Sequence, residues 1–215
     1  MDELTQDFEK SLFRESRDAI GDYIELGIDS FINDGILKDV PIVNTIVAVL
    51  KVGKNIHDRN LLKQTLTFIN EFNSNNISEE IMNEYKANID QNPKKCEKEL
   101  GRILLYLNNF IDKEKSIMLA KLFKAYVSRI IDWNEFCEYS EIINRIFLED
   151  LLILKCIKEG IKFKGKDGDN FRVERLYSLG IIGNIMFADY EKLKENIIEG
   201  RVLNTIGKKI CNIIF

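Results

Sequence analysis

GILKDVPIVNTIVAVLKVGKNIHDRNLLKQTLTFINEF, residues 35–72, decides the fold of this 215-residue chain. It contains the longest apolar run of the sequence, Pro41–Val52, which is interrupted only by Asn44, Thr45 and Lys51. Apolar residues fall on nearly every side of a helix drawn through this run, and that pattern is typical of a helix enclosed by others. We therefore expect the run to form the first arm of a buried helical hairpin at the centre of a bundle.

The ends of the two arms are marked by residues that start and stop helices. Asp39 before Pro41 is a helix start, because an Asp side chain accepts from free amide groups and Pro is tolerated in the first turn. Gly53 ends or loosens the first helix, and the second starts near Asp58 or Asn60. The side chains of the first arm that we expect to be buried, or to meet a partner, are Ile42, Val43, Ile46, Val47 and Leu50.

A membrane-inserting hairpin is the rival interpretation of the same apolar run. Crossing a bilayer core takes roughly 20 apolar residues. Lys38 and Asp39 on one side and Lys51 and Lys54 on the other leave only about a dozen. We expect a buried core helix, and the alternative is a membrane-perturbing effector that inserts residues 36–52.

Helical spacing continues through most of residues 1–157, where apolar residues recur every three or four positions. Ser78 and Asn92 are predicted to cap two of these helices, since each precedes a helical segment with a side-chain oxygen that can accept from its first turn. Pro93 directly after Asn92 supports that start. The sequence thus predicts a multi-helix bundle around the hairpin.

The last predicted helix of this segment starts at Asp132. Glu135 follows three residues later, the spacing of a capping box in which two side chains bond each other's backbone amides. We expect this helix to run unbroken to Ile157, with Glu149 and Asp150 as ordinary helix-surface or first-turn acids.

A change of composition after Ile157 predicts a domain boundary. Residues 158–170 contain three glycines and form either a linker or a short hairpin. Residues 171–215 then have the order helix, strand, loop, strand, helix, with Thr205 expected to cap the last helix. The predicted fold class is mainly α, with a small C-terminal α+β module that is winged-helix-like.

This order of elements makes nucleic-acid binding a candidate function of the module. Base reading requires Arg, Lys, Asn or Gln on the exposed face of the helix, and Arg172 and Arg175 are the candidates there. Glu174 between them counts against the idea. The candidate phosphate contacts are Arg201, Lys208 and Lys209. The competing interpretation is that the module covers the helical domain or mediates self-association.

Composition and motifs argue against several classes of function. A net charge of -4 gives no global reason to expect nucleic acid or an acidic membrane as a partner. The chain has no phosphate-binding glycine loop, and its one histidine, His57, adjoins Asp58, which a helix would point in a different direction. We expect no enzymatic activity, no cofactor and no metal site.

Cysteine usage and the N-terminus bear on the compartment. The N-terminal residues are acidic and helical, unlike a signal peptide, so we expect a cytoplasmic protein. The cysteines lie far apart without a CxxC pair, which is typical of reduced thiols in a cytoplasm. They are Cys96, Cys137, Cys156 and Cys211.

Four phrases of the chain resemble a known family. They are DGILKDVPIVNTIVAVLKVGKNIHDRNLLKQTLTFINEF (34–72), IMLAKLFKAYVSRIIDWNEFCEYSEIINRIFLEDLLIL (117–154), LYSLGII (176–182) and VLNTIGKKI (202–210). They resemble a widespread group of bacterial and prophage helical proteins, similar in plan to the Abi-alpha abortive-infection family. The resemblance implies a role around phage infection or mobile elements. It carries no catalytic motif, so it assigns no role to any single residue.

The leading hypothesis is therefore a non-enzymatic protein that binds another protein, or itself, in phage defence. The first alternative is a winged-helix regulator that binds nucleic acid through the C-terminal module. The second alternative is the membrane-perturbing effector described above.

Overall fold

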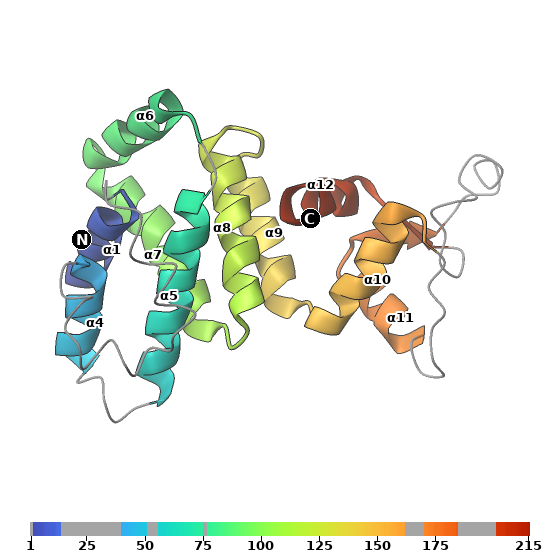
Figure 1. Ribbon diagram of the computed structural model, residues 1–215. Helices are drawn as coiled ribbons and strands as arrows, with labels where there is room; N and C mark the ends of the chain where they lie inside the picture. Colours follow the sequence, from blue (N-terminus) through green and yellow to red (C-terminus); the bar gives the residue numbers. More distant parts are fainter. Residues whose placement is uncertain (1, 14–39, 51–55, 75–76, 162–169, 185–200) are drawn as a thin grey trace. The chain divides into compact units, whose positions relative to one another are not determined.

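The computed structural model describes residues 2–13, 40–50, 56–74, 77–161, 170–184 and 201–215 (Figure 1). The protein is mainly α-helical with a small antiparallel sheet of two strands, so the predicted fold class is confirmed. It consists of two compact units, Met1–Phe136 (the N-terminal unit) and Cys137–Phe215 (the C-terminal unit). This division lies earlier than the expected boundary after Ile157, because the helix that ends near there packs on elements of the C-terminal unit.

The N-terminal unit is a bundle in which α5 packs along α8 and α7, and α1 packs on α4 and α7. Ser78 and Asn92 cap helices as predicted: Ser78 accepts from the amide of Ile81, and Asn92 accepts from that of Lys95. The helices of this unit are α1 (Glu3–Leu12), α4 (Pro41–Leu50), α5 (Ile56–Ser74), α6 (Glu79–Asp90), α7 (Pro93–Asn109) and α8 (Lys113–Val127), followed by the first residues of α9 (Trp133–Arg145).

Aromatic rings fill the core of the bundle. The Phe123 ring on α8 lies 6.0 Å from that of Phe68 and 5.3 Å from that of Phe72, measured between ring centroids. Phe136 approaches the same ring at 5.7 Å from the start of α9. All four side chains are fully buried. Each such ring removes a large apolar area from water, so this cluster stabilises the unit.

The predicted hairpin is present as α4 and α5, and α5 begins at Ile56, slightly before the expected start. The pair α5 and α8 forms the longest contact of the bundle, while α4 packs on α1 and α5. Of the side chains predicted for the buried face, Ile42, Val43 and Ile46 are buried, and Val47 is half-buried. The predictions for Asp39, for Gly53 and for the side chain of Leu50 lie outside the described residues.

Hydrogen bonds also fix α4 to α1. The amide of Ile42 donates to the Ser11 hydroxyl at 2.9 Å. The Thr45 hydroxyl donates to the Asp7 carboxylate, and this bond lowers the pKa of Asp7. Both contacts use groups that a lipid-facing helix would leave without partners, so they favour α4 as part of the folded bundle. Across the described residues, no helix is both long and apolar enough to cross a bilayer.

Glu9 on α1 gives the unit a predicted pH dependence. Burial raises the pKa of Glu9, the Cys96 thiol that donates to it at 3.3 Å lowers that pKa, and Asp90 raises it further, while Lys86 opposes the rise. Because the folded pKa is raised, Glu9 favours the folded state at low pH and this contribution is lost as the pH rises. We expect Glu9→Gln to be more stable than wild type at pH 7.

Urea denaturation at several pH values measures this difference. It should shrink to nothing as the pH falls well below 4.5, the ordinary value for this carboxyl group. Equal stability of the two proteins at neutral pH would contradict the assignment.

The C-terminal unit packs α10 against α11, β2 and α12. The two strands are antiparallel, with Ile182 opposite Leu203 and Asn184 opposite Arg201. Its elements are the rest of α9 from Cys137 onward, α10 (Leu148–Glu159), α11 (Asn170–Ser178), β1 (Ile182–Asn184), β2 (Arg201–Leu203) and α12 (Thr205–Ile214). The expected order of helix, strand, strand and helix is thus present after residue 170, while the expected linker lies partly outside the described residues, which omit 162–169.

Two local predictions in this region were wrong. Asn204, one residue before Thr205, caps α12 by accepting from the amide of Gly207 at 2.9 Å. The helix expected to run from Asp132 to Ile157 is two helices, α9 and α10, because Phe147 between them has an extended backbone. The predicted capping box at the start of α9 is confirmed, since Asp132 and Glu135 bond each other's amides at 3.1 and 2.8 Å.

Candidate functional site

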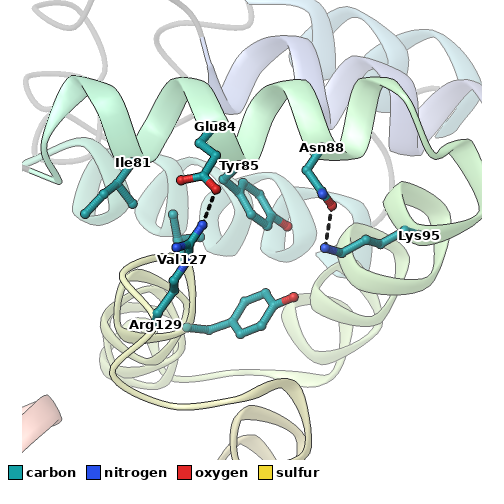
Figure 2. Close-up of a pocket in the computed structure, with 8 residues that line it drawn as sticks. Ile81, Glu84, Tyr85, Asn88, Lys95, Val127 and Arg129 are labelled. Atoms are coloured by element: carbon teal, nitrogen blue, oxygen red, sulfur yellow. Dashed lines mark hydrogen bonds and ion pairs between the residues drawn. The ribbon is translucent and has the colours of Figure 1, made fainter.

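A cavity of about 140 Å³ opens in the N-terminal unit between α6, the start of α7 and the end of α8 (Figure 2). Tyr85 and Tyr126 supply two phenol rings to its wall, and their ring centroids lie 6.1 Å apart in an edge-to-face arrangement. The full set of lining residues is Ile81, Glu84, Tyr85, Asn88, Lys95, Tyr126, Val127 and Arg129. We call this cavity the tyrosine pocket.

A buried carboxylate, Glu99, fixes the two phenols. Its side chain is on α7 and the residue is 3% exposed. The hydroxyls of Tyr85 and Tyr126 each donate to it at 2.7 Å, and the ammonium group of Lys95 lies 3.8 Å away. Burial and the Glu99 charge raise the pKa of Tyr85, so this phenol stays protonated and keeps donating.

Two cations stand at the rim of the tyrosine pocket. Arg129 pairs with Glu84, and Lys95 donates to the side-chain oxygen of Asn88 at 2.6 Å (Figure 2). Arg129 has a backbone φ of 59°, in the left-handed region. It is the only residue other than glycine with a positive φ in the part of the chain that the structure describes.

Cys96 and His57 are the groups that nucleophilic or acid–base chemistry would use, and neither lines the tyrosine pocket. Burial raises the pKa of the Cys96 thiol to about 12, which removes it as a nucleophile at neutral pH. His57 lies on the surface of α5, with Nδ1 3.6 Å from the neighbouring Asp58 carboxylate. The described residues hold no group of three His, Cys, Asp or Glu side chains arranged for a metal ion.

A second candidate site lies on the C-terminal unit, around Arg175. Its Nε and Nη2 atoms donate to the two carboxylate oxygens of Asp150 at 2.7 and 2.5 Å. The guanidinium carbon lies 4.2 Å from the ring centroid of Phe147 and 5.2 Å from that of Phe171. These two rings are 54% and 57% exposed. We call Phe147, Phe171 and Arg175 the aromatic surface.

The residues proposed for nucleic-acid contact fall in different settings. Arg175 is engaged by Asp150, and the guanidinium of Arg172 stacks on the Phe171 ring at 5.6 Å. Lys208 and Lys209 are exposed on α12. Arg201 pairs in β2, and its side chain lies outside what the structure describes. Of the five residues predicted to contact nucleic acid, Arg172 and Arg175 therefore lie together at the Phe171 ring.

Sequence reasoning missed the two acids that organise these sites. Asp150 is fully buried and bonded to Arg175, which corrects its assignment to the surface of the helix. The sequence contained a sign of this burial. Apolar residues lie four positions before Asp150 (Ile146) and three and four positions after it (Ile153 and Leu154), so Asp150 falls on the apolar stripe. Glu99 lies on the stripe of α7 in the same way.

Comparison with known proteins gives no relative: no protein-family model, no curated protein and no solved structure matches the chain.

Proposed function

We propose that this protein acts by binding another protein, and that the aromatic surface of the C-terminal unit is the contact. The observation that carries the proposal is the pair of half-exposed phenylalanine rings, Phe147 and Phe171, on either side of one guanidinium. Aromatic residues, phenylalanine among them, and arginine are enriched at protein interfaces relative to the rest of the surface.

The aromatic surface is held in place before any partner arrives. A bidentate pair with a fully buried carboxylate fixes the plane of the Arg175 guanidinium. The guanidinium in turn contacts the rings of Phe147 and Phe171 from a fixed position. A surface that is already ordered loses little side-chain entropy on binding, so more of the contact energy appears as affinity.

The charges around the surface favour protein over nucleic acid. The exposed side chains of α11 include Phe171, Glu174 and Tyr177, and Glu174 would repel phosphate. Arg175 already donates from two of its nitrogens to Asp150. Exposed Lys208 and Lys209 support the second candidate, a nucleic-acid contact through α12.

Phage defence is the setting that we propose for this binding. It rests on the resemblance to the Abi-alpha family alone. It directs the search for the partner toward bacterial cells during phage infection.

Affinity capture with matched variants tests the proposal. The wild-type chain, the double variant F147A/F171A and a control, L105A/I111A, are immobilised and exposed to extracts of infected and uninfected bacterial cells. The control removes two exposed apolar side chains from the N-terminal unit. We expect a protein that the wild type and the control retain and that F147A/F171A retains at least about tenfold less, since an interface hot spot contributes 2 kcal/mol or more.

Two results would count against the proposal. One is equal retention of every protein by all three forms. The other is retention that nuclease treatment removes and that Lys208→Ala with Lys209→Ala abolishes, which would favour the nucleic-acid function.

A further inference from the structure

We propose that the tyrosine pocket of the N-terminal unit binds a small organic anion, a carboxylate or phosphate group on a compact apolar body. This site is independent of the aromatic surface. The pocket offers an apolar wall for the body of such a ligand and two cations at its rim for the charge. Its volume of about 140 Å³ suits one ring-sized group with its charged substituent.

The lining combines rings and aliphatic side chains with polar side chains, and the two phenol hydroxyls among its polar groups already have a partner. Both phenol hydroxyls donate to Glu99 at 2.7 Å. The surfaces left for a ligand are therefore the phenol rings of Tyr85 and Tyr126, together with Ile81 and Val127. The Glu99 charge is compensated by the two hydroxyls and by Lys95, so it does not attract a cation in their place.

Each rim cation has one exposed partner that an anion can replace, while Lys95 also keeps its place 3.8 Å from the buried Glu99 carboxylate. Glu84, the partner of Arg129, has a side chain that is 58% exposed, and exposed ion pairs contribute little to stability. Asn88, the partner of Lys95, is a neutral and exposed amide. An anion can replace either acceptor at small cost, and a bound carboxylate or phosphate gains charge-assisted hydrogen bonds from the guanidinium.

The backbone of Arg129 is fixed by the end of α8. The amide of Ile130 donates to the Ala125 carbonyl at 2.8 Å and that of Arg129 to the Tyr126 carbonyl at 2.9 Å, the two bonds by which a helix ends through a left-handed residue. The left-handed region is unfavourable for an arginine and costs little for a glycine. The helix end therefore holds the Arg129 backbone in place while its side chain lines the pocket.

Fluorescence titration of the full chain tests the inference, because its single tryptophan reports on the pocket. The Trp133 ring lies 5.3 Å from that of Tyr126, between centroids. The probes are benzoate and phenyl phosphate as the two anions, benzamide as the neutral analogue and benzylamine as the cation. Calorimetry with the same probes confirms each binding curve.

Three variants make the test specific. Arg129→Gly removes the clamp and should weaken anion binding about tenfold or more, the value of one charged hydrogen bond. Glu84→Gln removes the competitor for Arg129 and should strengthen it by up to about fivefold. Glu80→Gln is the control, since Glu80 is an exposed acid on the same helix and does not line the pocket. Relief of strain should also raise the melting temperature of Arg129→Gly by about 2–4 °C.

The expected result is saturable binding of at least one anion, tightest in Glu84→Gln and weakest in Arg129→Gly, with benzamide and benzylamine far weaker. Preference for benzoate or for phenyl phosphate identifies the anionic group. The inference is overturned by the absence of saturable binding of both anions up to about 10 mM, by equal binding of benzamide, or by unchanged affinity in Arg129→Gly.

Discussion

Gly207→Ala destabilises the C-terminal unit by about 3 kcal/mol or more, at the upper end of the cost of overpacking. A Cβ atom at this position would lie 2.0 Å from the carbonyl oxygen of Ile181 and 3.2 Å from a side-chain carbon of Leu203. The oxygen belongs to the backbone and itself accepts from the amide of Asn204 at 3.3 Å, so it cannot move aside without loss of that bond. The new methyl group would push α12 away from the strands.

The matched control is Gly101→Ala in the middle of α7. A Cβ atom there meets nothing within 4 Å. Alanine is a better helix former than glycine, so this variant should be more stable than wild type by about 0.5–1 kcal/mol. Urea denaturation followed by circular dichroism measures both variants. Wild-type stability of Gly207→Ala would show that α12 does not pack as closely as the structure has it.

Asp150→Ala is expected to cost about 3 kcal/mol, the lower end of the range for removing one member of a buried ion pair. The carboxylate is fully buried and bonds both Nε and Nη2 of Arg175. Its loss leaves the guanidinium without its partner, although the arginine side chain is 27% exposed and water offsets part of the penalty. Asp150 also raises the pKa of Arg175, chiefly through the hydrogen bond.

Glu149→Ala is the control for this prediction, because Glu149 is the exposed neighbouring acid on the same helix. Its effect should stay within about 0.5 kcal/mol, as for most surface substitutions. Chemical denaturation of both variants gives the comparison, and affinity capture with Asp150→Ala should show weaker retention of the partner because the aromatic surface loses its anchor. Equal stability of the two variants would contradict the structural role of the pair.

The parts of the fold that could be predicted from sequence depend on neighbours along the chain. Ser78, Asn92 and the pair of Asp132 with Glu135 cap their helices as predicted, because each interaction joins residues three apart. The apolar run 41–52, which covers nearly every side of its helix, likewise predicted the burial of Ile42 and Ile46. Such signals need no knowledge of what the helix packs against.

The parts that could not be predicted depend on residues far apart in the sequence. Asp150 is buried because Arg175, 25 residues later, supplies its partner. Glu99 is buried because Tyr85 and Tyr126 arrive from two other helices. Asp150 was assigned to the surface and Glu99 was not singled out, because only the pairing makes the burial of either acid favourable.

The break in the helix predicted from Asp132 to Ile157 also depends on a residue far away in the sequence, Arg175. Helix propensity around Phe147 does not require an interruption, and none of its neighbours is Gly or Pro. In the folded chain the extended backbone at Phe147 lets the Asp150 carboxylate accept from its amide at 3.4 Å and places its ring on Arg175. The residue at the N-cap of α10 is thus also part of the aromatic surface.

Site-specific photo-crosslinking tests most directly the claim that the aromatic surface meets a protein. A benzoylphenylalanine residue replaces Phe171 in one form of the full chain and the exposed Leu105 in another, and both are irradiated in bacterial cells during phage infection. The account predicts a discrete protein adduct from position 171 and none from position 105. Equal adducts from both positions, or an adduct from position 171 that nuclease removes, would contradict it.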